Sequence, residues 1–407
     1  MKQIHDAIPA HCFRPSIARS MSYVMRDYLL LGSLVWAVYV YTPLIPSVHL
    51  RAIVYGLYTV VAGMIMTGIW ILAHEFGHGA FSRSKTLNSV VGFLLHSSLL
   101  VPYYSWKISY SHHHKSTGDL QRDTAYVPHS RIALGQDVDP HSISVAELTE
   151  DVPLVTLWHC LLFQLFGWPL YMLDNLSGQK AASGFPQHSH YWFGADSALY
   201  KESELHSIFL SDVGVLLMSA VLFSTVQLFD LWTIFIFFGI PYLWLNQWIV
   251  TITYLQHSDG TLPHCTHSQW SFAGGAATID RNFKLYGFDV DKHLFHGIVG
   301  THVLHHLVST IPFHDAYEAT DMGKHYRADR ATPLMTALFR NLRDCQFVEE
   351  SSGMDGSGVY MFRNLHGRGV KPRDLTVGET MSSWEGHLPP SSKEASRDWR
   401  DLVAWNW

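Results

Sequence analysis

Four apolar runs constrain the fold of this chain more than any other feature of its sequence. They cover residues 28–45, 52–73, 208–228 and 231–253. A helix of about 20 apolar residues crosses the hydrocarbon core of a bilayer. Within lipid a single segment must satisfy its own backbone hydrogen bonds, which a helix does. The runs therefore predict an all-α membrane protein with four transmembrane helices.

Two other apolar runs are not expected to span. Residues 90–104 are too short, and residues 154–173 are interrupted at Gly167-Trp168-Pro169. If all the histidine clusters described below lie on one side of the membrane, residues 154–173 either do not cross or cross only with a partner segment. Only 15% of the residues are charged, against about 25% in soluble proteins. The polar residues are concentrated between and after the runs, which indicates a substantial aqueous portion. The net charge of −6 gives no indication of nucleic acid binding.

Histidines gather in three tight clusters outside the four runs. The clusters are His74-Glu75-Phe76-Gly77-His78, His112-His113-His114 and His302-Val303-Leu304-His305-His306. Residues i, i+3 and i+4 share a helix face, so His302, His305 and His306 can converge on one point. Neutral imidazole binds iron, copper and zinc. Three clusters offer more ligands than one zinc needs, which predicts two metal ions.

The clusters can build one site only if they lie on one side of the membrane. An even number of spans must then separate the second cluster from the third, and residues 208–228 and 231–253 provide two. Basic residues flank the first two spans and are almost absent between them, where only Arg51 occurs. The flanking residues are Lys2, Arg14, Arg19, Arg26, Arg83, Lys85, Lys107, Lys115 and Arg122. The positive-inside rule therefore predicts that both termini and all clusters are cytosolic.

These boundaries divide the chain into four parts. Residues 1–27 form a cytosolic amphipathic segment, whose residues 11–27 are expected to be an interfacial helix. Residues 28–253 form the transmembrane core, with a cytosolic insert that carries the first two clusters. Residues 254–365 form a cytosolic, histidine-rich helical cap with the third cluster and a short strand at 359–362. Residues 366–407 form a polar tail.

Several kinds of metal protein have to be weighed. The first cluster matches HExxH, the zinc-protease signature, but a protease needs one zinc and has no use for further clustered histidines. A metal transporter would place ligands along a path through the bilayer. A two-iron site held by histidines can instead activate O2 to remove hydrogen from an unactivated C–H bond. At the membrane surface its substrate would be a lipid chain, and Glu75 would orient a ligand imidazole.

From about Ile8 to about Asn364 the chain resembles the membrane fatty acid desaturases, specifically the fungal microsomal delta-12 (oleate) branch. Besides the histidine clusters, the stretches that carry the resemblance are Ile8-Pro9-Ala10-His11-Cys12-Phe13, Leu100-Val101-Pro102-Tyr103-Tyr104-Ser105-Trp106-Lys107, Gly167-Trp168-Pro169-Leu170-Tyr171, Thr253-Tyr254-Leu255-Gln256-His257 and Glu318-Ala319-Thr320.

This resemblance implies O2-dependent insertion of a cis double bond, from oleate to linoleate, in a lipid- or CoA-linked chain. It implies two iron ions, and electrons from NADH through cytochrome b5 and its reductase as separate proteins. It places the chain in the endoplasmic reticulum membrane. The iron ligands that it implies are His74, His78, His113, His114, His257, His302, His305 and His306.

The second cluster departs from the family pattern HxxHH. Its first histidine is replaced by Tyr110, and the additional His112 stands about 200° round the helix from Tyr110. His112 therefore cannot replace the missing ligand unless the helix distorts, whereas Tyr110 shares a helix face with His113 and His114. Both Tyr110 and His112 are kept as possible ligands. A low-activity homologue remains open for this reason, as does a related acetylenase, hydroxylase or conjugase.

Other histidines are expected to be structural. We expect His96 to be hydrogen-bonded within an apolar run and His296 at most to support a ligand. His264, His267 and His314 are expected in loops near the cap. The cysteines Cys12, Cys160, Cys265 and Cys345 form no CxxC pair and are expected to be free thiols.

Overall fold

Helices dominate the computed structural model, which describes residues 2–130, 149, 152–179, 185–275, 278–322, 328–329, 331–350 and 356–365. The long helices are α2 (Ile17–Tyr41), α3 (Val48–His78), α7 (Pro153–Asp174), α8 (Leu205–Phe229) and α10 (Ile240–His257). The shorter ones are α1 (Lys2–Ala7), α4 (Lys85–Ser98), α5 (Tyr103–Ser116), α9 (Leu231–Ile234), α11 (Phe272–Gly275), α12 (Val290–His293), α13 (His302–Leu307), α14 (Phe313–Met322) and α15 (Leu334–Asp344). The predicted tail, residues 366–407, lies outside the described residues.

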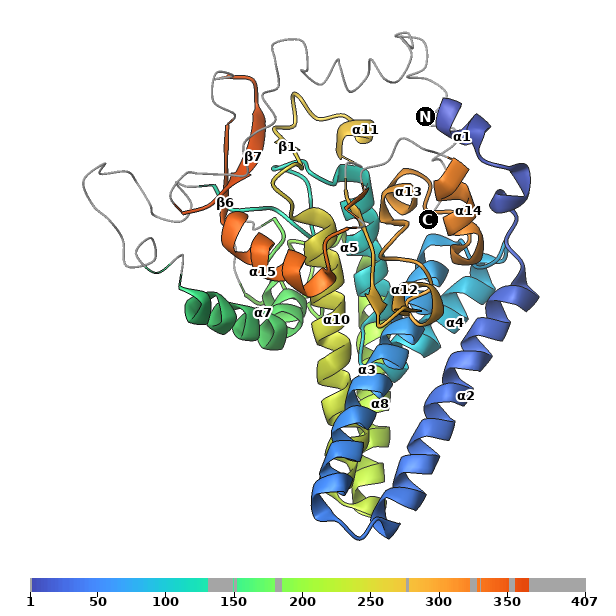
Figure 1. Cartoon of the computed structure of the whole chain (residues 1–407). Coiled ribbons are helices and arrows are strands. Elements are labelled where there is room, and N and C mark those ends of the chain that lie inside the picture. The colour runs from blue at the N-terminus through green and yellow to red at the C-terminus, as the bar shows by residue number, and fades with distance from the viewer. Residues whose placement is uncertain are drawn as a thin grey trace.

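Five helical segments are long and apolar enough to cross a membrane. They are Ile17–Leu44, Val48–His78, Pro153–Asp174, Glu202–Phe229 and Leu231–His257. Each of the four predicted runs lies within one of these segments, apart from the last residue of the first run. In Figure 1 the axes of α2, α3, α8 and α10 are roughly aligned, whereas α7 lies nearly at right angles to them, beside α10 and close to α15.

The predicted interfacial helix and the first predicted span form one continuous helix rather than two elements. A 3-10 turn covers Ala10–Phe13, and α2 then runs without a break from Ile17 to Tyr41. Ser16 caps its first turn by accepting a hydrogen bond from the Arg19 N–H. Neither proline nor glycine interrupts the sequence between Ile17 and Leu31, which explains the continuity.

The interruption predicted at Gly167-Trp168-Pro169 is wrong, because these residues lie within one continuous helix, α7. The helix continues through Pro169 to Asp174 and ends at Asn175, which is in the left-handed conformation. The side of α7 at Gly167 packs on α10, where a Cβ on Gly167 would lie 3.2 Å from Val250. Trp168 is buried beside it. This packing holds the helix together although Pro169 removes one backbone donor.

Asp230 separates the last two spans, as the sequence predicts. It ends α8 with a φ of 111°, and its carboxylate accepts hydrogen bonds from the Thr233 N–H and hydroxyl. The following helix contains a π-helical segment, Phe235–Gly239, before α10. Gly63 on α3 lets this helix approach closely, because a Cβ there would overlap the Cβ of Trp244.

Short strands occur only outside the long helices in the part of the chain that the structure describes. They are β1 (His264–Cys265), β2 (Asp280–Arg281), β3 (Lys284–Leu285), β4 (Phe288–Asp289), β5 (Ala328–Asp329), β6 (Phe347–Glu350) and β7 (Val359–Arg363). One antiparallel sheet has the order β1-β7-β6, with Val348 opposite Phe362, and the others are the pairs β2-β5 and β3-β4. The strand predicted at 359–362 is confirmed, and the fold is mostly helical rather than all-α.

Candidate metal centre

The histidines of the three clusters, except His112, come together with His257 at one end of the long helices. One group, the first histidine group, consists of His74, His78, His114 and His305. The second histidine group consists of His113, His257 and His306. Within each group the ligand atoms lie within 4.8 Å of one another. His302 lies beside the second group, with its Nε2 atom 3.1 Å from that of His257.

Four helices contribute these side chains, and each does so for a local reason. His74 and His78 are one helical turn apart on α3, so their Nε2 atoms lie 3.1 Å apart. Directly after them, Gly79 ends α3 with a φ of 72°, a conformation that suits glycine. His257 is the last residue of α10. The Asp280 carboxylate accepts the Val303 N–H and so fixes the start of α13.

Neighbouring histidines on α5 serve different groups. His114 faces the first group, with its ring centroid 4.5 Å from that of His78. His113 faces the second, 4.7 Å from His257. Consecutive residues of a helix are rotated by about 100°, so two adjacent imidazoles diverge. The pair therefore connects the two groups into one centre.

The nitrogen atoms fit metal ions better than they fit hydrogen bonds. Buried ring nitrogens of His114, His302, His305 and His306 have no hydrogen-bond partner among the described residues. Buried polar atoms are normally paired, so these require an occupant. Two imidazoles bound to one ion at about 2.0–2.1 Å place their nitrogens roughly 3 Å apart. The two Nε2 pairs at 3.1 Å have this spacing.

Burial keeps these imidazoles in the form that binds metals. Burial, and to a smaller extent the neighbouring His74, lowers the pKa of His305 to about 3. Burial, followed by neighbouring histidines, lowers the pKa of His114, His302 and His306 well below the usual value. At neutral pH the rings are therefore uncharged and each offers a lone pair.

Carboxylates and a hydroxyl orient the rings through their Nδ1 atoms. Asp123 lies 2.7 Å from His113 Nδ1. Glu75 lies 3.2 Å from His74 Nδ1 and 3.8 Å from His305 Nδ1, in agreement with its expected role. The Thr117 hydroxyl lies 3.2 Å from His306 Nδ1. Such contacts direct Nε2 toward a metal. Asp123 and Thr117 were not predicted, because no spacing signal links them to the clusters.

Tyr110 lies among the histidines, whereas His112 does not join either group. The ring of Tyr110 is 5.2 Å from His74 and stacks on Trp106 at 4.6 Å, both measured between centroids. Tyr110 is buried, and burial raises the pKa of its phenol, so the hydroxyl is protonated at neutral pH. The side chain thus lies where the family pattern places a histidine.

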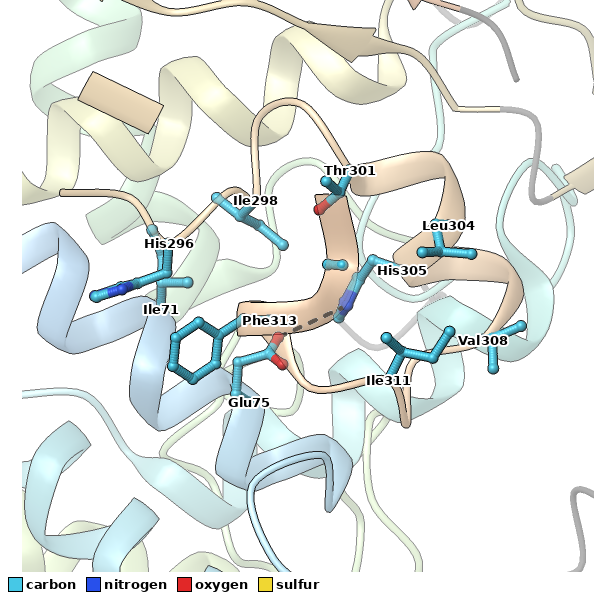
Figure 2. Close-up of a pocket in the computed structure, with 11 residues that line it drawn as sticks. Ile71, Glu75, His296, Ile298, Thr301, Leu304, His305, Val308, Ile311 and Phe313 are labelled. Carbon is cyan, nitrogen blue, oxygen red and sulfur yellow. Dashed lines mark ion pairs between the residues drawn. The ribbon is translucent and has the colours of Figure 1, made fainter. Parts of the chain in front are cut away.

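Two of the remaining histidines form the expected structural contacts. His96 is fully buried with its Nε2 atom 3.3 Å from the Trp70 carbonyl, as predicted. His296 is hydrogen-bonded to Asp27 of α2 at 2.7 Å. It lines a small cavity together with Glu75 and His305, and Figure 2 shows these side chains around it.

The expectation of loop positions fails for two of three other histidines. His264 is buried in β1, where its backbone pairs with β7 and its ring lies 5.0 Å from Phe362. His314 lies in the first turn of α14. His267 lies outside helices and strands and contacts Asp119 at 3.1 Å. Sheet and helix formation here depend on distant partners that the local sequence does not reveal.

Comparison with known proteins gives a consistent result. The fatty acid desaturase family matches residues 50–336. An oleate hydroxylase of Claviceps purpurea is 39% identical over 91% of this chain and 82% of its own length. A delta(12) fatty acid desaturase of Mortierella isabellina is 41% identical, over 86% and 88% respectively. An omega-6 fatty acid desaturase of Glycine max, an endoplasmic reticulum isozyme, is 38% identical over 89% and 90%.

Proposed function

Because this chain belongs to the fatty acid desaturase family, we propose that it converts oleoyl to linoleoyl chains by inserting a cis double bond at the delta-12 position. The acyl chain would be linked to a lipid or to CoA. The observation that carries the proposal is the pair of histidine groups at one end of the long helices. Their position at the end of the membrane-spanning helices suits a substrate that is itself a lipid chain.

We propose that the two groups hold two iron ions, and that His302 completes the ligand set with them. The ligands are then His74, His78, His113, His114, His257, His302, His305 and His306. Iron bound there would supply the oxidising power to remove hydrogen from an unactivated C–H bond. Asp123, Glu75 and Thr117 keep the imidazoles in place, and the surrounding burial keeps them uncharged.

The overall reaction removes two hydrogen atoms from adjacent carbons and reduces O2 to two waters. It consumes two further electrons and two protons for each double bond. We propose that the electrons come from NADH through cytochrome b5 and its reductase as separate proteins. The apolar rings of Tyr110 and Trp106, stacked beside the first histidine group, exclude water from that side of the centre.

We propose four membrane spans, formed by α2, α3, α8 and the segment Leu231–His257. The transverse direction of α7 in Figure 1 supports a position at the membrane surface. Both termini, the insert and the cap would be cytosolic, in the endoplasmic reticulum membrane. We propose that the boundaries after residues 27, 253 and 365 separate the N-terminal segment, the transmembrane core, the cap and the tail by function. The helix α2 begins before the first of these boundaries.

Expression in a host that makes oleate but no linoleate tests the activity. We expect linoleate in the extracted lipids, identified by mass spectrometry, and none with His305→Ala. Neither linoleate nor any other modified fatty acid from an expressed, iron-loaded protein would contradict the proposal. Purified protein should contain two irons per chain. A protein with zinc and negligible iron, active without O2, would contradict the mechanism.

Oleate hydroxylation is the second candidate, because the Claviceps purpurea oleate hydroxylase matches 91% of the chain. Hydroxylation would leave an oxygen atom on the acyl chain instead of releasing it as water. The same lipid analysis separates the two activities, since the hydroxylated product is heavier than oleate by one oxygen. A triple bond or conjugated double bonds would point to an acetylenase or a conjugase.

Topology can be tested independently of activity. Glycosylation or cysteine-accessibility tags inserted after residues 85, 120 and 310 should all report the cytosolic side. If the tag after residue 310 alone reported the lumen, α7 would cross the membrane and the proposed orientation would be wrong.

A further inference from the structure

A third cluster of metal-binding side chains lies apart from the two histidine groups. It consists of His11, Cys12 and Glu318, whose ligand atoms all lie within 4.8 Å of one another. His11 and Cys12 belong to the 3-10 turn Ala10–Phe13, and Glu318 belongs to α14. The cluster therefore joins the N-terminal segment to the helix that follows the third histidine cluster.

This junction is well packed. The Cys12 side chain has no solvent exposure and shares an apolar cluster with Ile8, Leu304, Ile311 and Ala319. Leu304 lies on α13, between the histidines of the third cluster. The backbone that carries His11 and Cys12 is thus held against the cap.

The distances suit one tetrahedral ion. His11 Nε2 lies 3.1 Å from a carboxylate oxygen of Glu318 and 3.6 Å from the sulfur of Cys12. Tetrahedral zinc binds nitrogen and oxygen at about 2.0–2.1 Å and sulfur at about 2.3 Å, which separates nitrogen from oxygen by roughly 3.3 Å and from sulfur by roughly 3.5 Å. Glu318 is exposed, so its side chain can move to bring its carboxylate oxygen to the ligand distance from the Cys12 sulfur.

The local charge also favours a cation. Burial and the carboxylates of Glu318 and Asp315 raise the pKa of the Cys12 thiol, so without a cation it is protonated. Asp315 is itself paired with Arg19 at 2.8 Å, which leaves Glu318 as the carboxylate that faces His11 and Cys12. His11 is exposed to solvent, so water can reach the site.

We propose that His11, Cys12 and Glu318 bind one Zn²⁺, with water as the fourth ligand. On binding, the thiol releases its proton to solvent and the thiolate sulfur bonds to zinc. The ion fastens the N-terminal turn to α14 and thereby supports the helices around the third histidine cluster. The inference stands apart from the desaturase reaction, because none of its ligands belongs to the two histidine groups.

Elemental analysis and cobalt binding test the site on the purified full-length protein. We expect one zinc per chain in addition to iron. Added Co²⁺ should give thiolate-to-cobalt charge-transfer absorption in the near ultraviolet, which histidine-only groups cannot produce. Cys12→Ser should abolish both signals, whereas Cys160→Ser, the matched control, should retain them.

Variants at the exposed ligands cover the case in which Cys12→Ser fails to fold. His11→Ala and Glu318→Gln should each weaken zinc binding at least about 10-fold, since even loss of a residue that only orients a metal ligand costs about 10- to 100-fold. Zinc content and charge-transfer absorption equal to wild type in both variants would overturn the proposal. Absence of zinc and of cobalt-thiolate absorption from the wild-type protein would overturn it as well.

Discussion

The phenol ring of Tyr110 lies 4.8 Å from the imidazole of His114, centroid to centroid. His114 belongs to the first histidine group, so Tyr110 reaches the same group but offers a protonated hydroxyl, a weaker ligand than imidazole. We therefore expect Tyr110→His to bind iron more tightly, so that a chelator removes it more slowly, or to raise the rate of double-bond formation. Metal analysis and fatty acid analysis of the same preparation measure both.

Two further variants identify what completes the centre. Tyr110→Phe removes only the hydroxyl and should leave the iron content unchanged. His112→Ala should also be neutral, since His112 joins neither group. If both Tyr110 variants match wild type while His112→Ala loses iron, His112 is the ligand and the interpretation of Tyr110 is wrong.

Asp123 should matter through His113 rather than through contact with substrate. Its carboxylate lies 2.7 Å from His113 Nδ1 and also accepts backbone N–H groups of Ala125 and Tyr126. Asp123→Asn should lower iron affinity about 10- to 100-fold, the usual range for a residue that orients a metal ligand. Asp119→Asn, another buried aspartate, is the control. Equal iron affinity in the two variants would contradict the role of Asp123.

The sequence predicts the features that depend on residues close together in the chain, and it misses those that depend on contacts between distant residues. The long helices follow from apolar length, and helical spacing explains why His302, His305 and His306 all lie at the centre. Their predicted convergence on one point is wrong, because His305 joins the first histidine group and His306 the second. His257 was expected only through the family resemblance. The contacts Asp123–His113 and His11–Glu318 could not be predicted, because they join residues without a shared local pattern. The same holds for the short strands, whose partners are distant.

Close packing between α3 and α10 should make Gly63 intolerant of a side chain. A Cβ there would overlap Trp244 and lie 3.0 Å from the Pro241 carbonyl oxygen. Gly63→Ala should destabilise the protein by about 1–3 kcal/mol, the usual cost of overpacking. Gly56 lies on the same helix, and a Cβ there would have no atom within 4 Å, so Gly56→Ala should be neutral or stabilising. Thermal unfolding in detergent compares the two, and an equal effect would refute the packing argument.

His264 should contribute to acid sensitivity. Burial lowers its pKa to about 4, below the value near 6.5 expected in the unfolded chain. Between these values the unfolded state binds the additional proton, so stability falls as pH falls from 6.5 toward 4. From pH 7 to pH 5, the unfolding free energy of the wild type should therefore fall by roughly 2 kcal/mol more than that of His264→Gln. A pH-independent difference would contradict this assignment.

The histidines of the centre are spread over α3, α5, α10 and α13, from His74 to His306. Of these four helices, α13 is synthesised last, so a nascent chain has an incomplete set of histidines during most of its synthesis. Assembly of the centre is therefore a late event in biogenesis, after the long helices have entered the membrane. A product that terminates before His302 would keep the long helices yet lack any means of completing either histidine group.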